Sequence, residues 1–110
     1  MVTFEEFAKL DIRVGKILQI EDHEKARKPM YKLLIDFGQE IGQRTIIAGI
    51  KARYPKEELK DKKVVCIVNL DPKVIAGEES YGMVLAAGDD METLSLLTVD
   101  KDIQEGSRVR

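Results

Sequence analysis

Five basic side chains stand in or beside segments that are predicted to form β-strands. Lysine and arginine bind phosphate oxygens, and several of them on one surface can hold a polyanion. We therefore expect these residues to line a surface that binds the backbone of a nucleic acid, although a solvated strand face explains any single one equally well. The five residues are Lys16, Lys28, Lys32, Arg44 and Lys73.

The charge of the chain is unevenly distributed. The formal net charge of −2 argues mildly against a nucleic-acid partner. Residues 1–73, however, hold fifteen lysines and arginines against twelve carboxylates, whereas residues 74–110 hold three against eight. Phosphate binding depends on where positive charge is concentrated, so a polarised molecule can bind despite its average. Because aromatic residues make up 5% of the chain and tryptophan is absent, we expect recognition of RNA shape and backbone more than extensive base stacking.

Side chains that support catalysis or metal binding are scarce. Cys66, the single cysteine, lies in an apolar run that predicts a buried strand, and His23, the single histidine, lies in a charged stretch that predicts a solvated loop. One cysteine and one histidine leave almost no residues for a zinc site or for a nucleophile with its base. The sequence also has no glycine-rich phosphate loop. We therefore expect no catalytic residue, no metal and no cofactor. With no membrane-length apolar run and no signal-peptide pattern, we expect a cytosolic protein without a membrane partner.

The periodicity along the chain predicts an all-β barrel. Thr3 and Glu6 form a capping-box pattern that begins a short helix, which ends near Leu10. The apolar phase slips around Gly15, which predicts the bend that lets one long strand serve both halves of a small barrel. With a short helix near residues 54–59, this is the order of a five-stranded OB-fold barrel in a single domain of residues 1–110, with an SH3-like barrel as the nearest rival. The predicted strands are residues 12–20, 31–37, 44–50, 63–70 and 83–87.

The segment from about residue 91 to residue 110 is too apolar for a tail, and we expect it to form a C-terminal β extension. Its apolar side chains could fold back on their own barrel or meet the same segment of a second chain. A dimer would bury apolar area that a chain of 110 residues can hardly bury alone. We therefore expect a homodimer whose interface includes Leu94, Leu96 and Leu97.

Four motifs occur in order along the chain: FAKLDIRVGKI at residues 7–17, RTIIAGI at 44–50, VNLDPK at 68–73 and GEESYGMVLAA at 77–87. Together they resemble the tRNA-binding domain family, which includes the C-terminal domain of many methionyl-tRNA synthetases and free-standing tRNA-binding proteins. The resemblance covers essentially the whole chain. It implies an OB fold, tRNA as the ligand, no catalytic activity of the domain itself, and an aminoacyl-tRNA synthetase as a partner or as the protein that carries it.

The resemblance also places Ser80 and Met83 in the tRNA site, with a buried core methionine as the alternative for Met83. Two features depart from the synthetase-linked pattern. The loop HEKARKPMYKL at residues 23–33 is more similar to the CsaA branch of small dimeric, secretion-related chaperones, and Tyr81 stands where the family usually has glutamate. A peptide-binding chaperone and a pure dimerisation module are therefore the alternatives to a tRNA-binding module.

Overall fold

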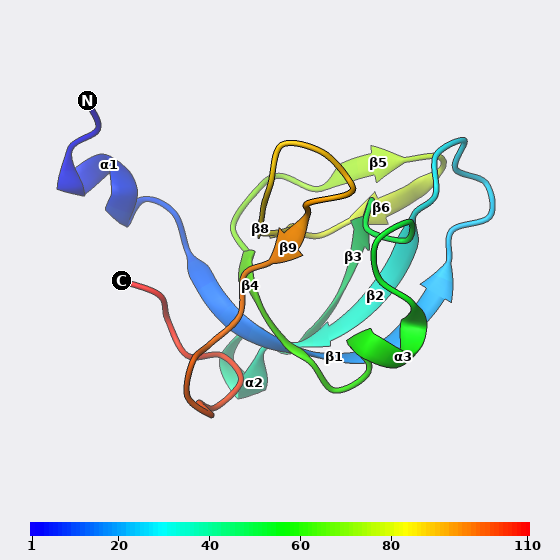
Figure 1. Cartoon of the computed structure of the whole chain (residues 1–110). Coiled ribbons are helices and arrows are strands. Elements are labelled where there is room, and N and C mark those ends of the chain that lie inside the picture. The colour runs from blue at the N-terminus through cyan, green and yellow to red at the C-terminus, as the bar shows by residue number, and fades with distance from the viewer.

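Five antiparallel strands curl into a nearly closed barrel in the computed structural model, which describes residues 1–110 (Figure 1). Their order is β3-β2-β1-β4-β7, and β3 and β7 approach each other to close the barrel. The predicted barrel is confirmed, although the predicted fifth strand is split into two short ones. The strands are β1 (Ile12–Asp22), β2 (Tyr31–Asp36), β3 (Gln43–Ala48), β4 (Lys63–Ile67), β7 (Met83–Val84) and, beyond the barrel sheet, β8 (Ala86–Ala87).

The long strand β1 serves both halves of the barrel, as the phase slip predicted. Residues 12–16 pair with β4 and residues 16–22 pair with β2. The register shift lies between Ile17 and Gln19, three residues later than the glycine itself. Gly15 has a different role, because a Cβ atom there would lie 2.5 Å from Ile35 and 2.6 Å from Phe37. A larger residue would therefore push core side chains apart where the strand crosses the barrel.

The barrel interior is a single apolar core of 13 buried residues. Inward-facing residues of β1 to β4 supply most of it, and Leu59 from α3 (Lys56–Leu59) adds to it from outside the sheet. Leu96 from β9 (Ser95–Leu96), which pairs with β8, also enters this core. The fully buried side chains are Phe37, Ile17, Leu33, Ile35, Ile46, Leu59, Val64 and Cys66.

The C-terminal segment folds back on its own barrel, which is one of the two arrangements left open by the sequence. The amide of Val14 donates to the carbonyl of Ser107 over 2.9 Å, and the amide of Val109 donates to the carbonyl of Ile12 over 2.8 Å. Val109 also covers a small apolar cluster on the outer side of β1 and β4. Lys63 fixes the middle of the segment, with its Nζ 2.7 Å from Asp102.

Arg13 in the first family motif has a structural role in this arrangement. Its guanidinium lies 2.6 Å from the carboxylate of Asp11 and 2.9 Å from that of Glu40, and it donates to the carbonyl of Gly106 over 3.1 Å. The hydrogen bonds that it donates to the two carboxylates raise its pKa, chiefly the one to Asp11. One side chain thereby joins the start of β1, the short helix α2 (Gly38–Ile41) and the C-terminal segment.

The N-terminal helix α1 (Phe4–Ala8) projects away from the barrel (Figure 1). Its capping box is confirmed, because the amide of Glu6 donates to the Thr3 hydroxyl and the Glu6 carboxylate accepts from the Thr3 amide, both over 3.1 Å. No residue of α1 is buried, and Phe4 is 80% exposed. None of the helices is long and apolar enough to cross a membrane.

Candidate nucleic-acid interface

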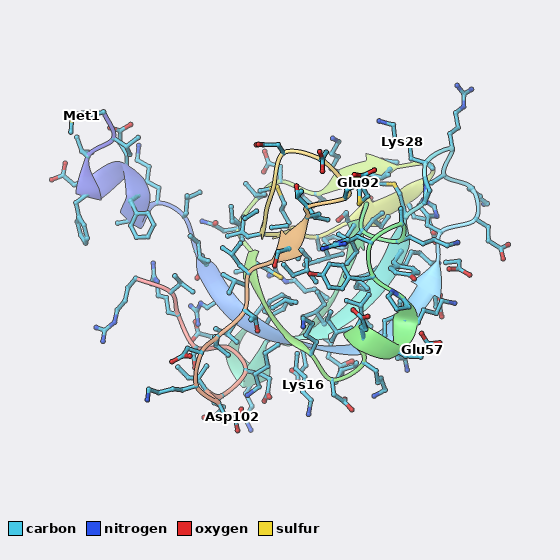
Figure 2. All side chains as sticks on the ribbon, viewed as in Figure 1. Met1, Lys16, Lys28, Glu57, Glu92 and Asp102 are labelled. Atoms are coloured by element: carbon cyan, nitrogen blue, oxygen red, sulfur yellow. The ribbon has the colours of Figure 1, made fainter.

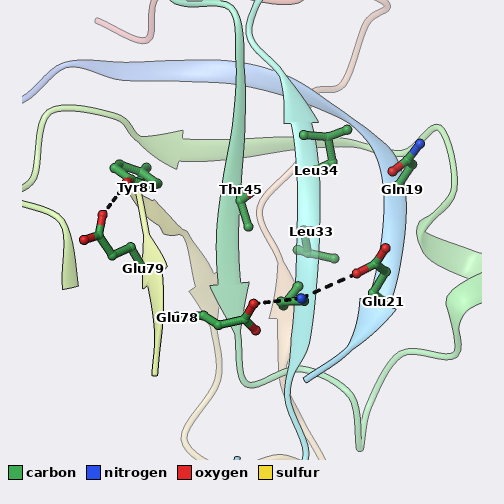
Figure 3. A pocket seen from close by; sticks show the side chains of 9 residues that line it. Gln19, Glu21, Leu33, Leu34, Thr45, Glu78, Glu79 and Tyr81 are labelled. Carbon is green, nitrogen blue, oxygen red and sulfur yellow. Dashed lines mark hydrogen bonds and ion pairs between the residues drawn. The ribbon is translucent and has the colours of Figure 1, made fainter. Parts of the chain in front are cut away.

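The outward side of β1, β2 and β3 forms a hollow of about 570 Å³ (Figure 3). The hairpin of β5 (Lys73–Ile75) and β6 (Glu78–Ser80) provides its other wall. OB barrels bind oligonucleotides on this face, between the loop that follows β1 and the connection that precedes the last strand. The hollow is lined by Gln19, Glu21, Lys32, Leu33, Leu34, Thr45, Glu78, Glu79 and Tyr81.

Lys32, one of the predicted phosphate ligands, is already engaged by carboxylates. Its Nζ lies 3.0 Å from Glu78 and 3.6 Å from Glu21, so an ionic row crosses the hollow from β6 to β1 (Figure 3). The hydrogen bond with Glu78 raises the pKa of Lys32 and lowers the pKa of Glu78. A phosphate would have to compete with both carboxylates for this lysine.

His23 is buried, so the predicted solvated loop is wrong at this residue. Its side chain is 2% exposed, because the β5–β6 hairpin covers it. Nε2 lies 2.7 Å from the carbonyl oxygen of Ile75, and Nδ1 lies 3.2 Å from the carboxylate of Glu78. The imidazole therefore joins the loop of residues 23–30 to the hairpin, and it fixes the two flanks of the hollow relative to each other.

Four cations without a carboxylate partner lie on these flanks. Lys25, Arg27 and Lys28 project from the loop of residues 23–30, and Lys73 lies at the start of β5. All four are exposed, and none has a carboxylate oxygen within 4.0 Å. They can meet phosphates without breaking an ion pair first.

Lys16 lies away from this surface. Figure 2 shows it at the lower edge of the barrel, with Lys28 on the opposite side. The pKa of Asp102 is lowered mainly by its hydrogen bond from Lys63 and also by the charge of Lys16, which places Lys16 beside the C-terminal segment. We therefore remove Lys16 from the candidate site, because the bend of β1 carries it to the other end of the barrel.

A second hollow, of about 380 Å³, brings together three predicted site residues: Lys73, Ser80 and Met83. Met83 is 46% exposed, so its side chain lies at the surface beside the hollow and not in the core. Ser80 is 3% exposed, and its hydroxyl oxygen accepts from the amide of Ile47 over 2.9 Å. We revise the expected role of Ser80 accordingly: it joins β6 to β3, and it supports the site from within.

Gly82 sets the geometry of the same motif. Its φ of +140° lies in the region that favours glycine, and a Cβ atom would lie 2.7 Å from the carbonyl oxygen of Ile67. The turn directs Ser80 inward and leaves its neighbour Tyr81 41% exposed. The Ser-x-Gly-Met motif therefore forms the turn that closes the barrel. It exposes its second and fourth residues, Tyr81 and Met83, to solvent.

A third hollow, of about 580 Å³, lies between Arg44 and Tyr81. The Arg44 guanidinium donates to the carbonyl of Val68 through Nη1, which holds the side chain at the edge of the barrel. Tyr81 lines both this hollow and the first one, so it stands at the centre of the candidate surface. The sequence marked Tyr81 only as a departure from the family pattern. Its one signal was an aromatic residue at the position where the family usually has glutamate.

Comparison with known proteins agrees with this geometry. The family model described as "Putative tRNA binding domain" matches residues 12–108. The chain belongs to this family. It is 50% identical over 109 residues to the methionine–tRNA ligase of Pyrococcus horikoshii, a match that covers 99% of the chain and 14% of that protein. The ligase of Methanocaldococcus jannaschii is 50% identical over 102 residues, which cover 93% of the chain and 15% of that protein.

Two solved structures share the fold over the whole chain. The CsaA chaperone protein from Picrophilus torridus has a TM-score of 0.92 at 41% identity and covers 100% of both chains. The MetRS related protein from Pyrococcus horikoshii has a TM-score of 0.88 at 36% identity, which covers 100% of this chain and 98% of that one. The OB-type barrel and the relation to the C-terminal region of methionyl-tRNA synthetases are thereby confirmed. The chain spans about a seventh of the length of the ligases it matches.

Proposed function

We propose that this domain binds tRNA through the outward face of β1, β2 and β3, with cations on both flanks holding the phosphate backbone. The observation that carries the proposal is the placement of four exposed cations without carboxylate partners on the loop of residues 23–30 and on the hairpin that His23 joins to it, in a member of the tRNA-binding domain family. These cations are Lys25, Arg27, Lys28 and Lys73. Phosphate contacts of this kind give affinity and orientation without base specificity.

The domain itself carries out no reaction in this proposal. Burial raises the pKa of the Cys66 thiol to about 12, so it is protonated and enclosed at neutral pH. The imidazole of His23 is occupied by Ile75 and Glu78 and lies beneath the hairpin. In the cell the domain would act in the cytosol, either alone or with a methionyl-tRNA synthetase, because the relatives that match it are methionine–tRNA ligases.

We further propose that two copies associate through the apolar side chains that the barrel leaves uncovered near its termini. Phe4 is 80% exposed, Phe7 37% and Leu97 38%. We narrow the expected interface, because Leu96 lies in the core of its own barrel and Leu94 packs against that core. A second copy would therefore cover Leu97 and α1. The C-terminal extension of about residues 91–110 carries Leu97.

The salt dependence of binding tests the RNA site. Affinity for bulk tRNA should fall steeply as salt rises, and Lys28→Ala and Lys73→Ala should each reduce the slope of log affinity against log salt by about one. Lys101→Ala is the matched control, because Lys101 is exposed in the acidic C-terminal segment, away from the hollow. An affinity that does not change with salt, or an equal effect of Lys101→Ala, contradicts the proposal.

A peptide-binding role of the CsaA type is the second candidate, and it is favoured by one observation. Leu70 and Met83 line the second hollow and are exposed, at 41% and 46%. An apolar, unfolded peptide would use this patch and would be insensitive to salt. Competition between such a peptide and tRNA, measured for the unmodified protein and for Met83→Ser, separates the two functions. Loss of peptide binding with tRNA binding intact assigns the patch to peptides.

A further inference from the structure

Tyr81 is held in place on three sides, although its ring is 41% exposed. Its amide donates to the carbonyl of Thr45 over 3.0 Å, which fixes the backbone against β3. Its hydroxyl donates to the carboxylate of Glu79, and that hydrogen bond raises the pKa of the phenol. The glycine turn that follows keeps the ring directed outward. An exposed aromatic ring with so little freedom loses little entropy when a ligand stacks on it.

The hollow beside Tyr81 has the composition of a site for a flat, polar ligand. Val68, Leu70 and Pro72 give it apolar walls, and Arg44 and Gln43 provide polar groups. Arg44 uses Nη1 for the carbonyl of Val68 and keeps its other N–H groups free.

The second amide in this hollow, Asn69, is already engaged on both sides. Its Oδ1 accepts from the amide of Asp11 over 2.8 Å, and its Nδ2 donates to the carbonyl of Lys9 over 2.7 Å. Gln43, in contrast, is exposed and makes no side-chain hydrogen bond within the chain. The polar groups available to a ligand are therefore those of Gln43 and Arg44.

We infer that an unpaired base of the bound RNA stacks on Tyr81 and lies in the hollow between Tyr81 and Arg44. Single-strand sites on OB barrels pair basic side chains for the phosphates with aromatic rings for the bases, and every base has a face that can stack. Arg44 supplies positive charge in the same hollow as the ring, and Lys73 lines the adjacent hollow, which shares Leu70 with it. This inference rests on the proposed RNA binding and adds a contact to it that does not depend on charge.

The intrinsic fluorescence of the protein reports on this contact. The chain has three tyrosines and no tryptophan. Tyr31 is 4% exposed and its hydroxyl donates to the carbonyl of Tyr54, while the Tyr54 hydroxyl accepts from the amide of Leu96. A stacked base should therefore quench the emission of Tyr81. The probes are a single-stranded oligoadenylate of about eight nucleotides, within the site size of one OB barrel, and a blunt RNA duplex of the same length.

We expect the oligoadenylate to quench the emission and the duplex to leave it unchanged. Tyr81→Phe should keep the affinity for oligoadenylate within about twofold, because the ring remains, and should remove the quenching. Tyr81→Leu should weaken binding of the oligoadenylate about fivefold or more, the loss expected for one stacked base. The salt dependence should keep its slope in Tyr81→Leu, because no phosphate contact is removed. Thermal unfolding of each variant verifies that it is folded.

Unchanged affinity in Tyr81→Leu, or quenching that persists in Tyr81→Phe, overturns the inference. Quenching by an apolar peptide but not by oligoadenylate also overturns it and assigns the ring to peptide binding. If Tyr81→Leu leaves salt-dependent tRNA binding unchanged, the stacked base is refuted and the proposed tRNA binding is not. Absence of any binding to tRNA or oligoadenylate by the unmodified protein refutes the proposed function itself.

Discussion

Replacing Leu96 by alanine tests whether the C-terminal segment belongs to its own barrel or to a second chain. Leu96 is 5% exposed and lies in the 13-residue core, whereas the next residue, Leu97, is 38% exposed. The substitution removes three buried carbons, worth about 2.4 kcal/mol at roughly 0.8 kcal/mol for each one. The cavity left behind adds to this, so the expected loss is about 2–5 kcal/mol of unfolding free energy.

Urea and thermal unfolding, followed by circular dichroism, measure the effect. A loss of this size is a large part of the roughly 5–15 kcal/mol that holds a small domain together, and it should lower the Tm by about 10 °C or more. Leu97→Ala is the matched control and should change stability by less than about 1 kcal/mol in the monomer. Because association stabilises a folded chain by mass action, both variants should be compared at several protein concentrations.

Equal losses of stability in the two variants contradict a place for Leu96 in the core of its own barrel. That place is also contradicted if Leu96→Ala leaves the Tm unchanged and light scattering shows that it converts a dimer into monomers. The second result would place Leu96 in the interface that the sequence predicted. The expected pattern is the opposite one: Leu96→Ala lowers stability at every concentration, and Leu97→Asp gives a folded monomer.

Two further predictions follow from groups whose pKa is shifted. Cys66, with a pKa of about 12, should react with a thiol reagent at pH 8 only after unfolding, so that the reaction rate rises with urea and levels off at high reagent concentration. Glu78 has a pKa lowered mainly by its hydrogen bond from Lys32, so its contribution to stability is present above the ordinary value of 4.5 and is lost as the pH falls through its lower folded value. Glu78→Gln should therefore show a shallower loss of stability in acid urea titrations, and a slope equal to that of the unmodified protein contradicts the ion pair.

The parts of the fold that could be predicted are those that local patterns determine. The alternation of apolar residues locates the strands, and Thr3 and Glu6 form their capping box with no help from the barrel. The phase slip at Gly15 predicts a bend because the burial of β1 must change sides where the strand passes from one partner strand to the other. The phase slip cannot show where the register shift lies, because the position of that shift depends on how β1 pairs with β2.

The parts that could not be predicted depend on contacts between distant segments. His23 looks solvated within its charged stretch, and it is buried only because the hairpin about fifty residues later covers it. Ser80 resembles an exposed ligand in the motif, but the amide of Ile47 in β3 draws its hydroxyl inward. Lys16 and Lys28 look equivalent in sequence, and the bend of β1 places them at opposite ends of the barrel.

The placement of charge on the candidate surface favours a large, folded polyanion over a small anion. In the middle of the first hollow, Glu21 and Glu78 neutralise Lys32, and Glu79 adds further negative charge beside Tyr81. A single phosphate entering there would meet carboxylates and would have to break an ion pair. Four unpaired cations, Lys25, Arg27, Lys28 and Lys73, stand on the flanks, so a ligand gains from them only if its phosphates reach both flanks at once. An RNA backbone that arches over the hollow does so, and its unpaired bases, which carry no charge, would face the centre where Tyr81 stands. The acidic centre thus selects for the shape of the ligand, and a chain of net charge −2 can still bind RNA.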